Sequence, residues 1–291
     1  MYQRRPEREV SETWMKEMDE IRASPVPRRS RQDALGEELG APIGPSSVPL
    51  QKTEHGGREH ISAIIPCLEE EAAIGPCVAA VLAHGVGEVI VVDGGSRDRT
   101  AERAAAAGAR VVVERRPGYG RALMAGIASL SSATSIVLFI DGDGSDRPEM
   151  IPALLEPIAA GRADFVLGSR LEGDREPGSL APTQIMAGRL AGLLIHLLYG
   201  ARFTDMSPFR AIRRAALDRL GMREETFGWN LAMQMRVAAS GMRTQEVPVG
   251  QRRRAGGASK VSGNWVGAVR AAGVLFATFV RLALELRLRR R

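Results

Sequence analysis

The chain has 291 residues, of which 44% are hydrophobic and 25% charged, so it is long enough for one large domain or two small ones with a sizeable core. A net charge of +6 favours anionic partners such as phosphates, nucleotides or acidic lipid. An aromatic content of 4% argues against a base-stacking nucleic-acid surface, and two cysteines exclude a disulfide framework or a Cys-rich metal site.

Residues 1–58 mix charges with Pro- and Ser-containing stretches such as "ASPVPRRSRQ" and show no sustained periodicity. This composition predicts a flexible or disordered N-terminal arm, with a partner-binding arm as the alternative. The opening "MYQRRPEREV" has no apolar stretch behind its charges, so we expect no signal peptide. We also expect no segment that crosses a bilayer, because none reaches about 20 uncharged residues.

From Ile61 onward, short β-branched runs alternate with Ala-rich segments of helical period. The predicted strands are residues 61–65, 88–92, 110–114, 136–140 and 164–168. The predicted helices between them are residues 72–84, 98–107, 119–130 and 148–160. This alternation predicts an α/β fold, a mostly parallel sheet with helices on both faces, whose ligands bind beyond the carboxyl ends of the strands.

The fourth predicted strand runs directly into carboxylates in "IVLFIDGDGSD", residues 136–146. An unbroken apolar run is typical of a strand buried on both faces, so its end delivers Asp141, Asp143 and Asp146 to one edge of the sheet. Like charges this close repel and raise one another's pKa unless a cation lies between them. The stretch therefore predicts a metal ion or another positive partner.

The other strand ends also carry polar groups. Glu70 follows the first strand, Asp93 with two glycines follows the second, and Arg170 follows the fifth. The third is followed by "RRPGYGRA", where arginines surround a Gly-x-Gly turn that opens a helix and suits an anion. No G-x-G-x-x-G follows the first strand and no G-x-x-x-x-G-K-[ST] occurs, which counts against a dinucleotide fold and a P-loop.

Seven segments in order resemble the motifs of one family. They are "IIPCLEEE", "VIVVDGGSRDRT", "ERRPGYGRALMAG", "FIDGDGSDRPE", "DFVLGSR", "TDMSPFRAIRR" and "RAGGASKVSG". Residues of about 61–265 thereby resemble a family 2 glycosyltransferase of the GT-A (Rossmann-like) fold, nearest the dolichol-phosphate mannose synthase-like branch. The resemblance implies a GT-A domain over residues 59–262, followed by a C-terminal amphipathic basic helix over residues 263–291.

The resemblance also implies roles for individual residues. The donor-binding residues would be Pro66, Glu70, Asp93, Arg116, Gly120 and Asp141. Asp143 would ligate Mg²⁺ or Mn²⁺, and Ser145 stands where that branch often has a glutamine ligand, so it would be a weaker one. The residues expected to hold the phosphate or acceptor are Arg170, Arg210, Arg254, Ser259 and Lys260. Alternatively, the arginine run at residues 252–254 belongs to a solvated loop.

One departure bears on turnover. In "FGWNLAMQMR" an acid often follows the "GW" pair in relatives, and here the corresponding position is Ala232, which cannot accept a proton. An acceptor phosphate, with a second pKa of about 6, could attack without a protein base. Alternatively, Asp205 is the catalytic base or orients a hydroxyl acceptor. A third interpretation is that Ala232 marks an inactive, nucleotide-sugar-binding relative.

Two segments are unusually apolar, residues 186–202 and the last helix with its arginine-rich end. Amphipathic helices of this kind suit an anionic membrane surface, and a homodimer interface or packing on the sheet is the alternative. We expect an inverting, metal-dependent transfer from a UDP- or GDP-sugar to polyprenyl phosphate or a small phosphorylated or hydroxylated molecule. The protein would be cytoplasmic or peripheral on the inner face of the membrane, without a nucleic-acid partner. A nucleotidyltransferase is the more distant enzyme alternative.

Overall fold

A computed structural model describes residues 60–255 and 265–288 of the chain. The predicted N-terminal arm, together with Ser259 and Lys260, lies outside the described residues. Within the described ranges, no helix combines the length and the apolar character that crossing a bilayer requires.

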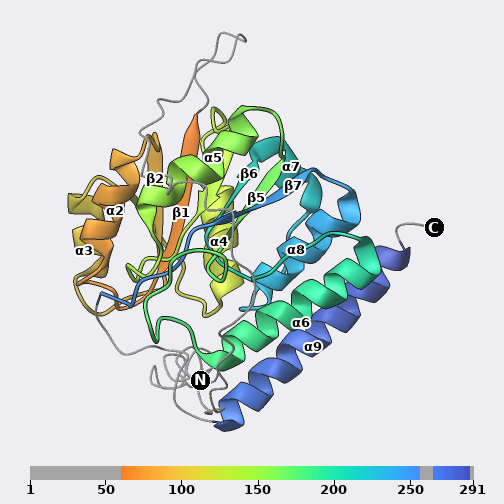
Figure 1. The fold of residues 1–291 in the computed structure, drawn as a ribbon. Coiled ribbons are helices and arrows are strands. Elements are labelled where there is room, and N and C mark those ends of the chain that lie inside the picture. The colour runs from red at the N-terminus through yellow and green to blue at the C-terminus, as the bar shows by residue number, and fades with distance from the viewer. Residues whose placement is uncertain (1–59, 256–264, 289–291) are drawn as a thin grey trace, which may run out of the picture.

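One seven-stranded sheet forms the centre of the molecule (Figure 1). Its strands are β1 (Ile61–Cys67), β2 (Glu88–Asp93), β3 (Arg110–Val113), β4 (Ile136–Phe139), β5 (Phe165–Ser169), β6 (Arg210–Arg213) and β7 (Thr244–Pro248). They are arranged in the order β3-β2-β1-β4-β6-β5-β7. Only β6 is antiparallel to its neighbours, so the prediction of a mostly parallel sheet is confirmed.

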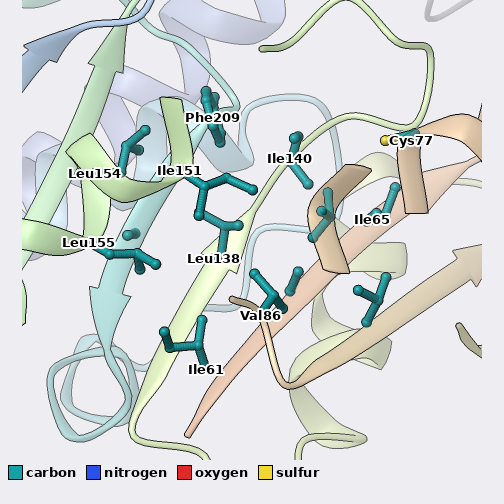
Figure 2. Packing of buried hydrophobic residues seen from close by; sticks show 14 of the residues in the cluster. Ile61, Ile65, Cys77, Val86, Leu138, Ile140, Ile151, Leu154, Leu155 and Phe209 are labelled. Carbon is teal, nitrogen blue, oxygen red and sulfur yellow. The ribbon is translucent and has the colours of Figure 1, made fainter. Parts of the chain in front are cut away.

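The central strands are buried on both faces because their side chains alternate between two apolar clusters. In β1, Ile65 belongs to one cluster and Ile64 to the other. In β4, Leu138 and Phe139 divide in the same way. Figure 2 shows the first cluster, where Ile65 and Leu138 meet residues from the helices on that face. Burial on two faces explains why these strands appear in the sequence as unbroken apolar runs.

The helices follow the strands in chain order. They are α2 (Ile74–Ala83), α3 (Thr100–Ala106), α4 (Tyr119–Ala128), α5 (Ile151–Ala159), α6 (Pro182–Tyr199), α7 (Arg214–Leu220), α8 (Trp229–Ser240) and α9 (Trp265–Leu288), with a short 3-10 helix, η1 (Pro148–Met150). Helices α2, α3 and α5 contribute to the first cluster, and α4, α7 and α8 contribute to the second. The helices therefore cover both faces, as the sequence predicts.

Helices α6 and α9 form an outer layer. Both contact α8, and Figure 1 draws them along the same side of the molecule. Ile195 of α6 and Leu282 and Leu286 of α9 belong to the second apolar cluster. Helix α9 therefore packs on the domain through one side.

Strands β6 and β7 were not recognised in the sequence as strands. Strand β6 reads Arg-Ala-Ile-Arg and is only four residues long, so neither its length nor its composition distinguishes it from a loop. It runs antiparallel between β4 and β5, which brings the start of β6 to the edge where the other strands end. Asp205, just before β6, therefore lies at the same edge as the loops after β1, β2, β4 and β5.

The close approach of α6 depends on a glycine. A Cβ atom added at Gly192 would clash with the main-chain carbonyl oxygen of Phe203, whereas one added at Gly273 in α9 would meet no atom within 4 Å. We predict that Gly192→Ala lowers the free energy of unfolding by about 1–3 kcal/mol through overpacking. Urea denaturation followed by circular dichroism measures the change.

Gly273→Ala is the matched control, because it is the same substitution in another helix interior. It should raise the free energy of unfolding by roughly 0.5–1 kcal/mol, since alanine is the better helix former. Equal effects of the two substitutions would contradict the packing of α6 against Phe203.

Candidate functional site

Three carboxylates converge after β4. The Asp141 amide donates to Asp146 Oδ2 at 3.0 Å, and the Ser145 amide donates to Asp143 Oδ1 at 2.8 Å. The Tyr119 hydroxyl, from the first turn of α4, donates to Asp141 Oδ1 at 3.1 Å. These bonds fold the loop back on itself, and Gly144 supports the turn with a φ of +75°.

Burial and mutual repulsion raise the pKa values of two of these carboxylates. Burial, and then the neighbouring charge of Asp143, raise the pKa of Asp141 to about 6. Burial and the charge of Asp141 raise the pKa of Asp146 well above its usual value. The cluster therefore favours a positive partner, as the sequence predicts.

An arginine occupies that position in the structure. Arg254 Nε lies 2.7 Å from Asp143 Oδ2, and Arg254 Nη1 lies 3.7 Å from Glu70 Oε1. Glu70 comes from the loop after β1, so the guanidinium group joins carboxylates from two strand ends. Among the three described arginines predicted to hold a phosphate or acceptor, Arg254 is the one with an ion pair to Asp143.

Asp93, at the end of β2, shapes its own loop. Its carboxylate accepts hydrogen bonds from the amides of Gly95, at 3.1 Å, and Ser96, at 3.0 Å. Ser96 in turn accepts a hydrogen bond from the amide of Glu69 at 2.9 Å, which ties this loop to the one after β1. The Glu70 amide also donates to Thr100 Oγ1 at 2.8 Å, so the two segments are joined at more than one point.

The remaining predicted donor residues lie in three different settings. Pro66 is buried within β1, opposite Val92 of β2. Gly120 packs against the main chain of residues 224–226, and its amide donates to the Thr226 carbonyl at 3.2 Å. Arg116 is exposed and pairs with Glu114, with Nη2 2.7 Å from Oε2. The Arg116 side chain is therefore the outermost of the three.

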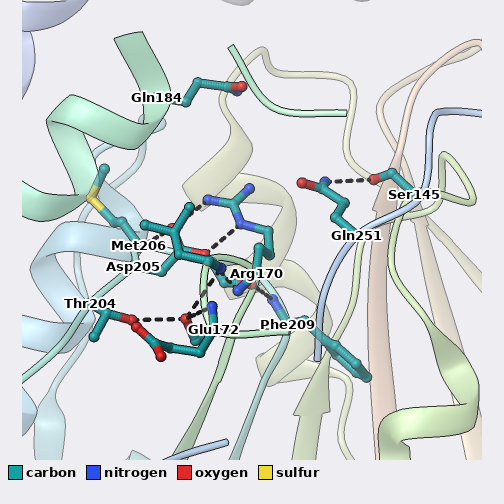
Figure 3. Close-up of polar contacts among 12 residues, drawn as sticks. Ser145, Arg170, Glu172, Gln184, Thr204, Asp205, Met206, Phe209 and Gln251 are labelled. Atoms are coloured by element: carbon teal, nitrogen blue, oxygen red, sulfur yellow. Dashed lines mark hydrogen bonds and ion pairs between the residues drawn. The ribbon is translucent and has the colours of Figure 1, made fainter. Parts of the chain in front are cut away.

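Arg170 and Asp205 form a buried ion pair at the same edge (Figure 3). Arg170 donates from Nε to Asp205 Oδ2 at 2.7 Å and from Nη2 to Oδ1 at 2.8 Å, and its amide donates to Oδ2 at 3.0 Å. The Gln234 side chain of α8 donates to the Asp205 carbonyl oxygen at 2.8 Å. Asp205 therefore connects the end of β5, the start of β6 and α8.

These contacts bear on the predicted role of Asp205 as a base. Burial alone would raise its pKa, but the charge and the hydrogen bonds of Arg170 hold the pKa below its usual range. A carboxylate that already accepts bonds from Arg170 and from the Met206 amide is a poor proton acceptor. The geometry thus favours a positioning role for Asp205 over general base catalysis.

Arg210 is fully buried at the start of β6. It donates to the carbonyl oxygens of Ser207 and, at 3.2 Å, of Asn230. Burial lowers its pKa to about 10. The sequence predicts that Arg170 and Arg210 hold a phosphate, but here each is engaged by protein groups.

Ala232 lies in α8 and is buried in the second apolar cluster. Trp229 and Leu231 of the same helix belong to this cluster as well. Position 232 therefore contributes to the core in this protein.

Two polar residues of this region were absent from the predicted site. Tyr119 contacts Asp141 from 22 residues away, and Gln251 Nε2 donates to Ser145 Oγ at 3.2 Å from 106 residues away. The signal for Tyr119 is its place at the first turn of the helix opened by "RRPGYGRA". No spacing in the sequence indicates the contact of Gln251, because it depends on the path of the chain after β7.

The residues that could hold a divalent cation are Asp143 and Ser145, which supply only oxygen atoms. Among the residues described by the structure, no three His, Cys, Asp or Glu side chains are arranged as a complete metal site. Mg²⁺ commonly binds through one or two carboxylates and takes its other ligands from substrate phosphates and water. An oxygen set that already attracts a cation, Arg254, fits that mode of binding.

We predict that Asp205→Asn lowers the free energy of unfolding by about 3–5 kcal/mol, because it leaves the buried charge of Arg170 without its partner. Asp218→Asn is the control, since Asp218 forms an exposed i,i+4 pair with Arg214. That change should cost less than about 0.5 kcal/mol. Urea denaturation of both variants tests this, and similar small losses would contradict a stabilising role for the buried pair.

Comparison with known proteins gives the same fold and one family. Residues 62–221 match the family model described as glycosyl transferase family 2. An uncharacterised glycosyltransferase of Mycobacterium tuberculosis is 39% identical over 215 residues, which are 72% of this chain and 93% of that protein. An undecaprenyl-phosphate mannosyltransferase of Micrococcus luteus is 33% identical over 224 residues, which are 71% of this chain and 89% of that protein.

Among solved structures, glucosyl-3-phosphoglycerate synthase from Mycobacterium tuberculosis, in complex with Mn²⁺, UDP and phosphoglyceric acid, superposes with a TM-score of 0.62. The two are 23% identical, and the match covers 77% of this chain and 78% of that one. This likeness confirms the GT-A architecture. The family model and the two relatives establish that the chain belongs to glycosyltransferase family 2.

Proposed function

We propose that the protein transfers a sugar from a UDP- or GDP-sugar to a polyprenyl phosphate. The observation that carries the proposal is the carboxylate cluster after β4, which is buried, attracts a cation and lies at the strand edge of a family 2 domain. The relative from Micrococcus luteus is named as a transferase to undecaprenyl phosphate. The loops after β1 and β2 would bind the nucleoside through Pro66, Glu70 and Asp93.

In this proposal Asp143, supported by Ser145, holds Mg²⁺ or Mn²⁺. The cation would stabilise the negative charge that develops on the departing nucleoside diphosphate. The M. tuberculosis synthase, which has the same fold, was solved in complex with Mn²⁺ and UDP, and this supports a divalent cation in the proposed reaction. Asp141 would face the donor, with its orientation set by the Tyr119 hydroxyl.

A phosphate acceptor fits a site in which the Asp205 carboxylate is paired with Arg170 and does not act as a base. A phosphate monoester is largely ionised near neutral pH, so its oxygen can attack the anomeric carbon without losing a proton to the protein. The bond from that carbon to the diphosphate oxygen breaks as the new bond forms, and direct displacement of this kind inverts the anomeric centre. Arg170 and Asp205 would keep the loop before β6 in place during the reaction.

A membrane-bound acceptor also fits the outer surface of the protein. In the described part of the chain, all of the exposed large hydrophobic side chains except Val113 lie on α6 and α9. They are Met186, Leu190, Leu193 and Leu197 on α6, and Phe276, Val280 and Leu284 on α9. Their spacing of three and four residues gathers them on one side of each helix, away from the buried side that faces α8.

The charges of this apolar face favour an anionic surface. Helix α6 contains no acidic residue, and the one acid of α9, Glu285, is paired with Arg236 at 3.1 Å. Arg189 and Arg287 are exposed on the same two helices, whereas Arg281 is paired with Glu224. A symmetric dimer would bring these like charges together, whereas anionic lipid complements them. These charges support the proposal that the protein binds peripherally at the cytoplasmic face of a membrane.

The first experiment is a screen for donor binding and turnover. Wild-type protein is heated with UDP- and GDP-sugars, with and without Mn²⁺, and diphosphate release is followed with undecaprenyl phosphate in detergent. At a ligand concentration of about 100 Kd, binding should raise Tm by roughly 5–10 °C. Stabilisation by a donor with no release under any condition would favour an inactive binding protein and Ala232 as its cause.

Asp143→Ala should abolish the part of the Tm increase that depends on Mn²⁺, because it removes the carboxylate proposed to hold the cation. Asp218→Ala, which removes an exposed carboxylate outside the site, should keep the full increase. A metal-dependent increase that survives in Asp143→Ala would rule out this residue as the ligand.

The double variant Leu190→Glu, Leu197→Glu should lose binding to vesicles that contain anionic phosphatidylglycerol, by more than about tenfold in partition coefficient. Val113→Glu is the control, since Val113 is similarly exposed, at 53%, but lies on β3. Co-sedimentation measures both. The apolar face would instead be a subunit interface if the wild type does not bind vesicles but forms a dimer, and if the double variant is monomeric.

A further inference from the structure

The residues that follow β7 lie across the carboxylate loop. The Arg252 amide donates to the Ser145 carbonyl at 2.9 Å, and the Ala255 amide donates to the Asp143 carbonyl at 3.2 Å. Gln251 adds its side-chain bond to Ser145 Oγ at 3.2 Å. We call residues 251–255 the strap, because they are attached to the loop at both ends.

The three arginines of the strap differ in direction. Arg252 pairs with Glu149, and Arg253 donates from its amide to Glu176 Oε2 at 2.7 Å and from Nε to the Pro177 carbonyl at 2.8 Å. These contacts lie in exposed surroundings. Arg254 points inward, and its side chain is only 21% exposed. The alternative of a uniformly solvated arginine run therefore does not describe Arg254.

Arg254 uses the oxygen that a metal ion would need. The other oxygen of Asp143, Oδ1, already accepts the Ser145 amide at 2.8 Å, which leaves Oδ2 for a cation. Arg254 Nε takes Oδ2 at 2.7 Å. Mg²⁺ binds oxygen ligands at about 2.0–2.1 Å, so it would enter the space beside Oδ2 that the guanidinium group now fills.

The Nη1 atom of Arg254 has weaker contacts than the Nε atom. Arg254 Nη1 is buried and has no hydrogen-bond partner among the described residues, and its ion pair with Glu70 is long, at 3.7 Å. An arginine with a free, buried donor is well suited to a bidentate anion such as a phosphate group. The arrangement thus combines one strong contact to Asp143 with an open capacity for an anion.

We propose that Arg254 is an internal competitor of the metal ion: it neutralises Asp143 in the donor-free protein and transfers to the donor diphosphate when the metal binds. The proposal rests on the proposed function. Removing Arg254 from Asp143 exposes the carboxylate, and the incoming diphosphate provides a new anionic partner for the guanidinium group. Metal and nucleoside diphosphate then bind with positive coupling, since each makes the position of the other available.

The variant Arg254→Met tests the competition, because methionine keeps the aliphatic chain and removes the charge. Binding of Mn²⁺ alone is measured by electron paramagnetic resonance of the free ion. We expect Arg254→Met to bind Mn²⁺ at least about fivefold more tightly than the wild type, within the usual range of coupling between sites. Arg253→Met, in the same strap but directed outward, should leave the affinity for Mn²⁺ unchanged.

The opposite sign is expected for the nucleotide. With saturating Mn²⁺, Arg254→Met should bind UDP or GDP at least about fivefold more weakly by calorimetry, because the diphosphate loses its arginine. Arg254→Lys retains a cation, so its affinity for Mn²⁺ should stay near that of the wild type. Thermal unfolding of each variant establishes that it is folded, and Arg254→Lys provides the comparison if Arg254→Met is unstable.

The outcomes separate this proposal from the function itself. If Arg254→Met and the wild type bind Mn²⁺ equally well, Arg254 does not compete with the metal, although metal-dependent transfer still stands. A weaker affinity of Arg254→Met for Mn²⁺ would also overturn the proposal. If neither protein binds Mn²⁺ even with UDP or GDP present, both the competition and the metal-dependent function are wrong.

Discussion

The crowding of three carboxylates at the buried end of β4 is the constraint on which the site depends. Their charges cannot be left uncompensated in a protein interior, as the raised pKa values of Asp141 and Asp146 show. Two neighbouring groups compensate part of this charge: the Tyr119 hydroxyl donates to Asp141, and the Arg254 guanidinium group pairs with Asp143. The same negative charge would attract a divalent cation, and the bound cation would in turn attract a diphosphate.

A buried ion pair organises a second part of the strand edge. Arg170 and Asp205 join the end of β5 to the loop before β6, and Gln234 connects that loop to α8. Since α8 also supports α6 and α9, the buried pair is linked through one helix to the apolar face of the protein. In the proposed reaction, this helix would connect the strand edge, where the donor would bind, with the surface that would face the lipid-linked acceptor.

Much of the sheet and of the carboxylate cluster was predictable from the sequence, because apolar strand runs and the acids that follow them directly are local features of the chain. Strands β1, β2, β4 and β5 were recognised from unbroken apolar runs, and Asp141 and Asp143 from their place directly after one of them. Strand β6 was missed because four residues with an arginine at each end carry no periodicity. The ion pair of Asp205 with Arg170 could not be predicted either. The two residues are 35 positions apart in the sequence, and only the folded sheet brings them together.

The two outer strands of the sheet have a consequence for self-association. Strand β3 has four residues and β7 has five, and β7 ends in Pro248, which lacks an amide hydrogen. Short outer strands with a terminal proline offer few free main-chain groups to another strand. Two copies of this domain are therefore poorly suited to form one continuous sheet through these edges, which also protects the folded protein against aggregation by strand addition.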